Sequence, residues 1–288
     1  MGIELQISGK TKLTGLLGGS SITGSFSPMM HTASFKEVGV DAVYVSFPIE
    51  QDDLEAAVNG LQKIAVGYNV TMPYKTQICK FLNGLSPAAE LMGAVNTVEI
   101  REGKSFGHNT DGAGFVENIR LFGFEPKGKI VTIIGAGGAG SAIFTQLALD
   151  GVAEIRVFNI KDSFWEVTKN RVVELSSKTN VSVSLHDLEN RNELRESIAQ
   201  SDLLVNATSV GAGDLEGQSN VDEDMLHEGL LVADTVYKPL ETKMIQMAKS
   251  QGLVTAPGVG MLLQQAALAE KIWFGTDMPV DLIRKNFF

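Results

Sequence analysis

The sequence predicts an α/β protein made of two α/β domains, the second of them built on a doubly wound parallel sheet. Apolar runs of strand length alternate with amphipathic stretches through the 288 residues, a pattern typical of repeated βα units. One apolar run leads directly into a glycine-rich segment, GAGGAG, at residues 135–140. A chain of this length has room for two ordinary domains, and a change in composition around residues 111–129 marks the seam between them.

The first part of the chain is predicted to hold three strands, two helices and a hairpin. The strands are expected at 12–18, 42–48 and 64–70, the helices at 28–38 and 52–63, and the hairpin at 96–100 and 105–109 around a Glu102-Gly103 turn. Ser27 is predicted to be the N-cap of the first helix, because Pro28 suits a first helical turn.

The second part of the chain is predicted to hold five strands with helices between them. It opens with a helix at 112–122 and a turn at 126–128, followed by strands at 130–134, 154–158, 181–185, 203–206 and 230–235. A helix is expected at 141–149, and the helical spacing of apolar residues predicts a last helix at 261–274. Five short strands separated by helices suit a doubly wound sheet.

Composition and charge exclude several classes of function. The net charge of −10 comes with no basic stripe, so no nucleic-acid partner is expected. No apolar run approaches the roughly 20 residues that cross a bilayer, and residues 1–12 lack the apolar core of a secretory signal. A cytoplasmic protein without a membrane partner is therefore expected. The single cysteine, Cys79, and the four unpaired histidines predict neither a disulfide nor a metal site.

The glycine-rich segment predicts a dinucleotide site of the Rossmann type. Gly135, Gly137 and Gly140 satisfy G-x-G-x-x-G. Because an apolar strand precedes them and a helix follows, backbone N–H groups at the start of that helix would face a pyrophosphate. The alternative is a tight strand-to-helix turn with no ligand.

The residues after the next strand favour NAD, with NADP as a weaker or additional cofactor. The segment VFNIKDSFW offers Asp162 and Lys161 but no arginine. A carboxylate can bind the ribose hydroxyls of NAD, whereas a 2′-phosphate calls for arginine. Asp162 could instead be the N-cap of a helix that starts near Ser163, and both roles can hold together.

Lys75 and Asp111 are the candidate proton-transfer pair. Lys75 lies in NVTMPYK, at a predicted strand-to-helix turn, and Asp111 lies in GHNTDGAG at the seam between the domains. A lysine held by a carboxylate can accept a hydroxyl proton while a cofactor takes a hydride. Burial would favour the neutral amine and a neighbouring carboxylate the ammonium, so Lys75 could be a general base or part of a shared relay. The alternatives are a solvated surface lysine and a helix-capping aspartate.

Two serines before the first helix are a second candidate polar group. Ser25 and Ser27 flank Phe26. They are either a turn and a helix cap, or two hydroxyl donors for an anion at the start of the helix.

Eight segments, in order along nearly the whole chain, resemble the shikimate dehydrogenase family. These segments are SFSPMMH, NVTMPYK, GAVNTV, GHNTDGAG, GAGGAG, NATSVG, DTVYKP and GVGMLLQQAA. The resemblance implies a substrate-binding catalytic domain at residues 1–111 and 257–288, rejoined by the C-terminal helices, and a Rossmann NAD-binding domain at 112–256. It also implies an active site in the cleft between them.

The resemblance assigns roles to individual residues. Lys75 and Asp111 would be the catalytic pair and contact the substrate, and Ser25 and Ser27 would hold its carboxylate, with Tyr237 nearby. Thr71, Asn96 and Gln265 would bind the ring hydroxyls. Gly258 would approach the nicotinamide with its backbone. The rest of the cofactor site would comprise Ala136, Gly137, Gly138, Ala139, Asn159, Asp162, Thr208, Thr235, Val236, Tyr237 and Lys238. Tyr237 could instead be a packing residue, and Gln265 a polar helix position.

Two segments bear on the branch of the family. Members that use NADP carry N-R-T/S after the second Rossmann strand, and here the arginine position is Ile160. FNIKDSFW resembles instead the quinate/shikimate dehydrogenase branch, which accepts NAD. Residues 69–71, Asn-Val-Thr, are closer to the shikimate-specific pattern, so quinate activity stays open.

The sequence therefore predicts reversible NAD-dependent oxidation of shikimate and/or quinate to the 3-dehydro ketone, with the proton passing to Lys75 and Asp111. The partner would be a small polyol carboxylate, and a homodimer stays open. A methylene-folate dehydrogenase of similar build and a non-catalytic NAD-binding regulatory protein are the alternatives.

Overall fold

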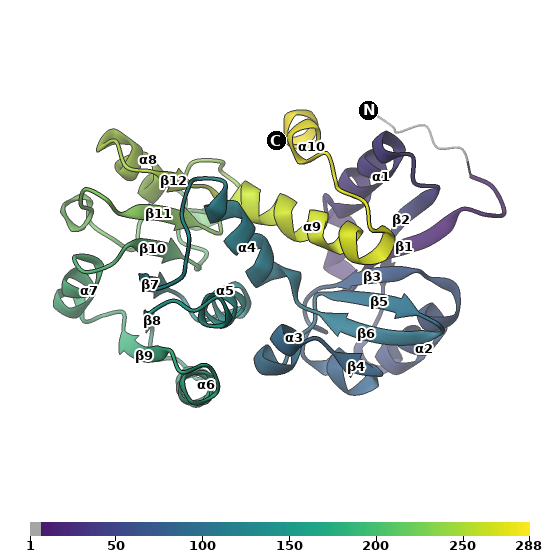
Figure 1. Cartoon of the computed structure of the whole chain (residues 1–288), viewed down its shortest axis with the longest axis horizontal. Coiled ribbons are helices and arrows are strands. Elements are labelled where there is room, and N and C mark those ends of the chain that lie inside the picture. The colour runs from purple at the N-terminus through teal and green to yellow at the C-terminus, as the bar shows by residue number, and fades with distance from the viewer. Residues whose placement is uncertain (1–6) are drawn as a thin grey trace. The chain divides into compact units, whose positions relative to one another are not determined.

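A computed structural model describes residues 7–288, so the first half of the N-terminal segment used to infer localisation lies outside the described residues. The chain forms two compact units (Figure 1). Unit 1 combines the chain up to Thr110 with Gln265–Phe288, and unit 2 is Asp111–Gln264. Within the described residues, no helix has the length and apolar character that crossing a membrane requires.

Unit 1 is built on a mixed six-stranded sheet with strand order β2-β1-β3-β5-β6-β4. Its strands are β1 (Lys12–Gly18), β2 (Ala42–Pro48), β3 (Gly67–Val70), β4 (Gly84–Leu85), β5 (Thr97–Arg101) and β6 (Lys104–His108). β1 runs parallel to β2 and β3, whereas β5 pairs antiparallel with both β3 and β6. The predicted hairpin is therefore confirmed as β5 and β6.

The helices of unit 1 come from both ends of the chain. They are α1 (Ser27–Val38), α2 (Leu54–Ile64), α3 (Pro87–Met92), the second half of α9 (Gly258–Phe274) and α10 (Val280–Phe287). Trp273 on α9 donates its indole N–H to Val98 O on β5 at 3.0 Å. A side chain at Gly67 would overlap this indole, so the glycine in β3 leaves the space that Trp273 of α9 occupies on the sheet.

Unit 2 is built on a six-stranded, fully parallel sheet with strand order β12-β11-β10-β7-β8-β9. Its strands are β7 (Ile130–Ile134), β8 (Glu154–Asn159), β9 (Ser182–Asp187), β10 (Leu203–Asn206), β11 (Leu231–Asp234) and β12 (Thr255–Ala256). The order reverses at β7 and β10, which is the topological switch point of a doubly wound fold.

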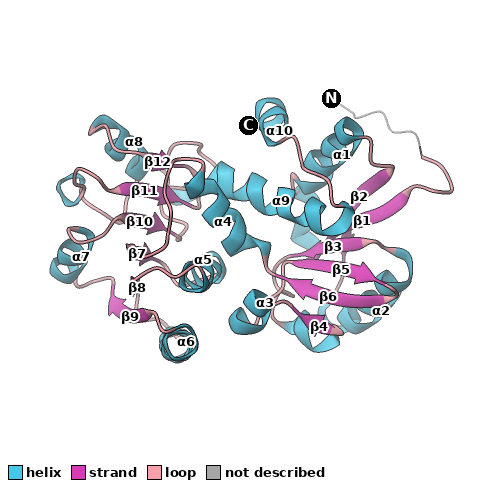
Figure 2. Ribbon diagram, in the orientation of Figure 1, coloured by secondary structure: helices cyan, strands magenta, loops and turns pink. Residues whose placement is uncertain are grey.

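Helices cover both faces of this sheet (Figure 2). They are α4 (Thr110–Arg120), α5 (Gly138–Leu149), α6 (Trp165–Thr179), α7 (Arg191–Ile198) and α8 (Lys243–Ser250). α7 and α8 share one buried cluster with the sheet, which includes Ile134, Phe158 and Val232. The predicted α/β class, with a parallel Rossmann-like sheet, is confirmed.

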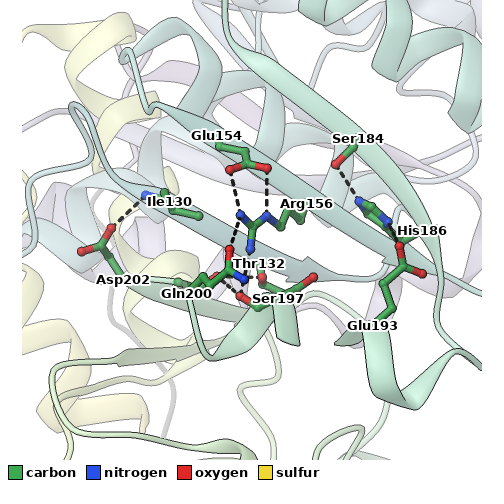
Figure 3. Close-up of polar contacts among 11 residues, drawn as sticks. Ile130, Thr132, Glu154, Arg156, Ser184, His186, Glu193, Ser197, Gln200 and Asp202 are labelled. Atoms are coloured by element: carbon green, nitrogen blue, oxygen red, sulfur yellow. Dashed lines mark hydrogen bonds and ion pairs between the residues drawn. The ribbon is translucent and has the colours of Figure 1, made fainter. Parts of the chain in front are cut away.

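Polar side chains fix the β8–β9 side of the sheet (Figure 3). Arg156 on β8 makes two 2.9 Å bonds to Glu154 and reaches Gln200 Oε1 at 3.1 Å. On β9, His186 Nε2 lies 2.6 Å from Ser184 Oγ, and its Nδ1 lies 2.6 Å from Glu193 Oε1 at the start of α7. These contacts hold the edge strand to the helix that follows it.

Several predicted boundaries differ from the structure. β3 starts at Gly67 rather than at residue 64, because α2 continues through Ile64. α5 starts three residues early, at Gly138, and α4 starts at Thr110. The sheet of unit 2 has a sixth strand, β12, which the five predicted strands did not include.

Candidate active site

The glycine loop joins β7 to α5 in a shape that only glycine permits at two positions. Gly135 has φ of +102°, a left-handed value that other residues avoid. A side chain at Gly140 would overlap the Gly135 carbonyl oxygen. Gly137 is the N-cap of α5, and added side chains at Gly137 and Gly138 would meet nothing within 4 Å. The Cβ positions of Gly137 and Gly138 at the helix N-terminus are therefore open, as an anion site at a helix N-terminus requires.

Asn159, at the end of β8, braces this loop. Its Oδ1 accepts the Ala136 N–H at 3.0 Å, and its Nδ2 donates to Ile160 O at 2.9 Å. The structure thus brings together two residues that were predicted to contact the cofactor. Beyond Asn159 the chain is exposed, with Ile160 at 51% accessibility and no arginine through residue 165.

Asp162 is not the N-cap of α6. The helix starts at Trp165 with Phe164 as its N-cap, so the predicted start near Ser163 is two residues early. The Asp162 carboxylate instead accepts the Phe164 N–H at 2.9 Å, in a turn just before the helix. The neighbouring Lys161 forms a 2.8 Å ion pair with Asp187, which raises the pKa of Lys161 and lowers that of Asp187. Two charged side chains are therefore exposed just after Asn159. The Asp162 carboxylate has no ion pair among those found in the described residues, whereas the Lys161 ammonium is paired with Asp187.

The turn at residues 235–238 packs against the start of α9. A side chain at Gly258 would overlap the carbonyl oxygen of Val236, so these two predicted cofactor segments lie in direct contact. Val236 is buried, Thr235 half-buried, and Tyr237 and Lys238 exposed. Tyr237 has 41% of its surface accessible.

Asp234 organises this turn, although it was not among the predicted site residues. Its Oδ1 accepts from Asn206 Nδ2 at 3.0 Å and from the Val236 N–H at 2.9 Å, while Oδ2 accepts from Thr242 Oγ1 at 2.6 Å. Asp234 is 1% exposed, and burial raises its pKa to about 6 even though these hydrogen bonds oppose the shift. Asn206 Oδ1 in turn accepts from the Thr208 hydroxyl at 2.7 Å. The sequence offered one signal for this cluster: Asn206 and Asp234 are the first residues of the NATSVG and DTVYKP segments.

Ser25 and Ser27 lie next to each other at the start of α1. The two hydroxyl oxygens are 3.1 Å apart, and Ser25 Oγ accepts the Ser27 N–H at 3.2 Å. Ser27 is not the N-cap: it is the first helical residue, and Phe26 is the N-cap without a side-chain bond. The predicted cap is wrong because Ser25 captures the backbone N–H two residues ahead and lets the helix begin at Ser27. Both serines are half-buried.

Asn96 forms the centre of a buried polar network in unit 1. Its Oδ1 accepts the Thr110 N–H at 2.7 Å and the Thr97 hydroxyl at 3.0 Å. Asn69 donates to the Thr97 hydroxyl at 2.9 Å and to Asn96 O at 3.1 Å. Asn96 is 3% exposed, and these hydrogen bonds fix the position of its amide.

Lys75 lies on the segment between β3 and the 3-10 helix at Gln77–Phe81, as predicted. Its carbonyl accepts the Val95 N–H at 2.8 Å, next to Asn96 in sequence. Thr71 is tied to β1 by a 2.9 Å bond from its N–H to Leu17 O. The side chains of Lys75 and Thr71 are half-buried, so Lys75 is not a fully solvated surface lysine.

Asp111 is the second residue of α4 and the first residue of unit 2. It follows Thr110, whose N–H is held by Asn96, and it lies in the first helical turn rather than at the cap. A carboxylate there is favourable for the helix dipole whatever its other roles. Gln265, on α9, is half-buried.

Known proteins match nearly the whole length of the chain. Residues 17–98 match the "Shikimate dehydrogenase substrate binding domain" family, and residues 258–285 match the "Shikimate 5'-dehydrogenase C-terminal domain" family. A shikimate dehydrogenase (NADP(+)) from Listeria innocua is 44% identical, and the alignment covers 99% of both chains. The chain belongs to the shikimate dehydrogenase family.

Solved structures of this family agree with the fold. Shikimate 5-dehydrogenase from Listeria monocytogenes, in complex with shikimate and NAD, has a TM-score of 0.96 and 44% identity, and the match covers 99% of both chains. Quinate dehydrogenase from Corynebacterium glutamicum, in complex with NAD, has a TM-score of 0.86 and 28% identity, with 96% of this chain and 98% of that chain covered. The quinate enzyme is thus a more distant relative than the Listeria proteins. Membership of this family makes the chain an enzyme of the shikimate dehydrogenase type rather than a methylene-folate dehydrogenase or a non-catalytic NAD-binding protein.

Proposed function

We propose that this chain catalyses the reversible oxidation of the ring hydroxyl of shikimate to the 3-dehydro ketone, with a nicotinamide dinucleotide as hydride acceptor. The observation that carries the proposal is the 44% identity to a shikimate dehydrogenase over 99% of both chains. The glycine loop supports it, because its open helix N-terminus fits a dinucleotide pyrophosphate. The cytoplasm is the proposed compartment, and a homodimer is left open.

The proton of the reacting hydroxyl is assigned to Lys75 and Asp111. Lys75 is half-buried on a segment pinned by Val95, and Asp111 directly follows Thr110, which is pinned by Asn96. The nicotinamide supplies the hydride acceptor, and the two side chains share the proton that leaves the oxygen. Ser25 and Ser27 bind the substrate carboxylate, with Tyr237 nearby, whereas Thr71, Asn96 and Gln265 bind the ring hydroxyls.

The domains follow from these assignments. Residues 1–111 and 257–288 bind the substrate, and residues 112–256 bind the dinucleotide. The cofactor site is lined by the loop at 136–139, Asn159, Asp162, Thr208, the turn at 235–238 and Gly258, all of which lie in unit 2 of the structure. The contact of Gly258 with Val236 and the bond from Ala136 to Asn159 support this grouping.

For the cofactor we propose NAD, with NADP as an additional and weaker one. The curated Listeria relatives are named for NADP(+), yet the Listeria monocytogenes crystal structure holds NAD. Here position 160 is isoleucine, Lys161 is paired with Asp187, and Asp162 leaves a carboxylate exposed beside Asn159. A carboxylate at this place repels a 2′-phosphate and can accept from ribose hydroxyls.

Quinate is the second proposed substrate, because FNIKDSFW resembles the branch that uses it. The deciding experiment measures initial rates with shikimate and with quinate, each with NAD and with NADP, by absorbance of the reduced nicotinamide. Shikimate with NAD should give the highest kcat/KM. No turnover of either polyol with either cofactor would overturn the proposed function, and a preference for NADP would overturn only the cofactor assignment.

A further inference from the structure

A buried histidine–glutamate pair joins α1 to α9 inside unit 1. His31 Nδ1 lies 2.7 Å from Glu270 Oε1, and Ser34 Oγ donates to Glu270 Oε2 at 2.6 Å. All three residues are 0% exposed. Burying ionisable groups is costly even when they are paired, and neither His31 nor Glu270 belongs to the set that contacts substrate or cofactor. A role that offsets the free-energy cost of burying His31 and Glu270 is therefore expected.

The pair connects to Ser27 through Tyr44. The His31 ring stacks on the Tyr44 ring with centroids 4.4 Å apart and planes 10° from parallel. The Tyr44 hydroxyl donates to Asn69 Oδ1 at 2.8 Å. Burial raises the pKa of Tyr44, and its interaction with the Ser27 side chain opposes that shift. Glu270, His31, Tyr44 and Ser27 thus form a connected series inside unit 1.

The His31 ring makes a single hydrogen bond. Among residues 7–288, His31 Nε2 has no hydrogen-bond partner, so the bond from Nδ1 to Glu270 is the directional restraint on a ring that also packs against Phe35, Tyr44 and Trp273. In the tautomer that carries its proton on Nδ1, the imidazole donates to the carboxylate, and the buried Nε2 then has no proton that would need an acceptor. Removing Glu270 would release the ring on which Tyr44 stacks.

We propose that His31 and Glu270 are positioning residues for the substrate carboxylate, acting through Tyr44 on the Ser27 hydroxyl. This inference rests on the proposed function, in which Ser27 binds that carboxylate. Ser27 and His31 are one helical turn apart on α1, and the His31 ring stacks on Tyr44. A change in the tilt of the His31 ring should therefore shift Tyr44 and, through it, the Ser27 hydroxyl.

The opposing interpretation is that the pair only clamps α9 to α1. A double variant separates the two. Replacing both members of a buried pair with apolar residues of similar size is often neutral for stability, whereas removing one member leaves the other unpaired. His31→Phe with Glu270→Leu should therefore keep the helices packed, with Ser34 turning to a carbonyl of its own helix, but it removes the bond that orients the ring.

The experiment measures the double variant against the wild type in steady-state assays and by chemical denaturation. We expect a denaturation midpoint near that of the wild type, a KM for shikimate raised by about tenfold, as for a weakened charge-assisted hydrogen bond, and a KM for NAD within about twofold. The ratio of kcat/KM for shikimate to that for methyl shikimate, which lacks the anion, should fall. An unchanged shikimate KM and an unchanged ratio in the folded double variant would overturn the inference.

Two single variants keep the test decisive if the double variant does not fold. Glu270→Gln retains an oxygen that faces His31 Nδ1, so it should keep the shikimate KM near the wild-type value, whereas Glu270→Ala should raise it. Equal KM values for these two variants would contradict a positioning role. Ser27→Ala tests the underlying assignment separately: if it leaves the shikimate KM unchanged, the proposed carboxylate site itself is wrong.

Discussion

Lys75 and Lys80 are five residues apart and differ in burial, so they provide a test position and a control position on one segment. Lys75 is half-buried beside the Asn96 network, whereas Lys80 is exposed and lies over the Phe81 ring. Lys75→Ala should lower kcat for shikimate oxidation by roughly 10²–10⁴-fold, the usual loss when a general acid–base group is removed. Reduced-nicotinamide absorbance measures the rate.

Lys80→Ala is the control, and it should retain the wild-type rate because its ammonium faces solvent. Near-normal turnover by Lys75→Ala in a folded protein would remove Lys75 from the proposed mechanism. A loss of the same size in both variants would indicate a disturbance of the segment rather than of the chemistry.

Asp162 gives a second prediction for a single residue. Asp162→Ala should weaken NAD by several-fold, as expected for the loss of about one hydrogen bond to a charged group, and NADP by less, because repulsion of the 2′-phosphate is relieved at the same time. Titration of each dinucleotide by calorimetry measures the two dissociation constants. Equal weakening of both would assign Asp162 only to the turn that it makes with the Phe164 N–H.

The sequence predicted site residues that lie inside a motif better than residues that support the motif. Gly137 was predicted from the strand–glycine–helix pattern, which fixes local geometry, whereas Ala136 and Asn159 were predicted only from the family resemblance. The cap at Ser27 was predicted wrongly, since a choice between two serines depends on which hydroxyl reaches the backbone N–H. Asp234 was missed although it is the first residue of the DTVYKP segment, because its contacts with Asn206 and Thr242 form only in the folded chain.

At the scale of an element, the β7–α5 loop depends on close backbone packing at Gly140 and not at Gly138. Gly140→Ala should destabilise unit 2 by about 1–3 kcal/mol, because its side chain would overlap the Gly135 carbonyl and force a shift. Gly138→Ala should not destabilise it, because the space around Gly138 is open and alanine favours a helix. Urea unfolding of both variants without ligand measures the difference, and equal stability would show that the loop can relax.

Elements with strong periodicity were predicted well, and elements held by tertiary packing were not. β1, β2, β7 and β10 have the predicted bounds, because each is a mostly apolar run of strand length. β12 has only two residues, too few for a period, and it exists because β11 offers a free edge. The first turn of α9 was missed because Gly258 and Gly260 are poor helix formers, and contacts with the 235–238 turn and Asn118 hold it in place.

At the scale of the whole molecule, the two tryptophans report on the two units separately. Trp165 is the first residue of α6 in unit 2, and Trp273 lies on α9 in unit 1. Trp165→Phe and Trp273→Phe each leave one reporter. These variants make it possible to assign a change in stability to the unit in which it arises.

Asp234 should make the stability of unit 2 fall as the pH rises from about 4 to about 6. Burial raises its folded-state pKa from 3.8 to about 6, so between these values the folded chain binds more protons than the unfolded chain. The free energy of unfolding therefore decreases with pH, by about 3 kcal/mol for a shift of this size.

Other carboxylates also titrate in this range, so the quantity to follow is the difference between the wild type and Asp234→Asn. This variant keeps an acceptor for Asn206 and Val236 but cannot ionise. The wild type should lose stability relative to the variant across this range when Trp165 fluorescence is followed in the Trp273→Phe background. A difference that stays constant with pH would show that the three donors around Asp234 offset its burial completely, and that the turn at 235–238 holds an ionised carboxylate without penalty.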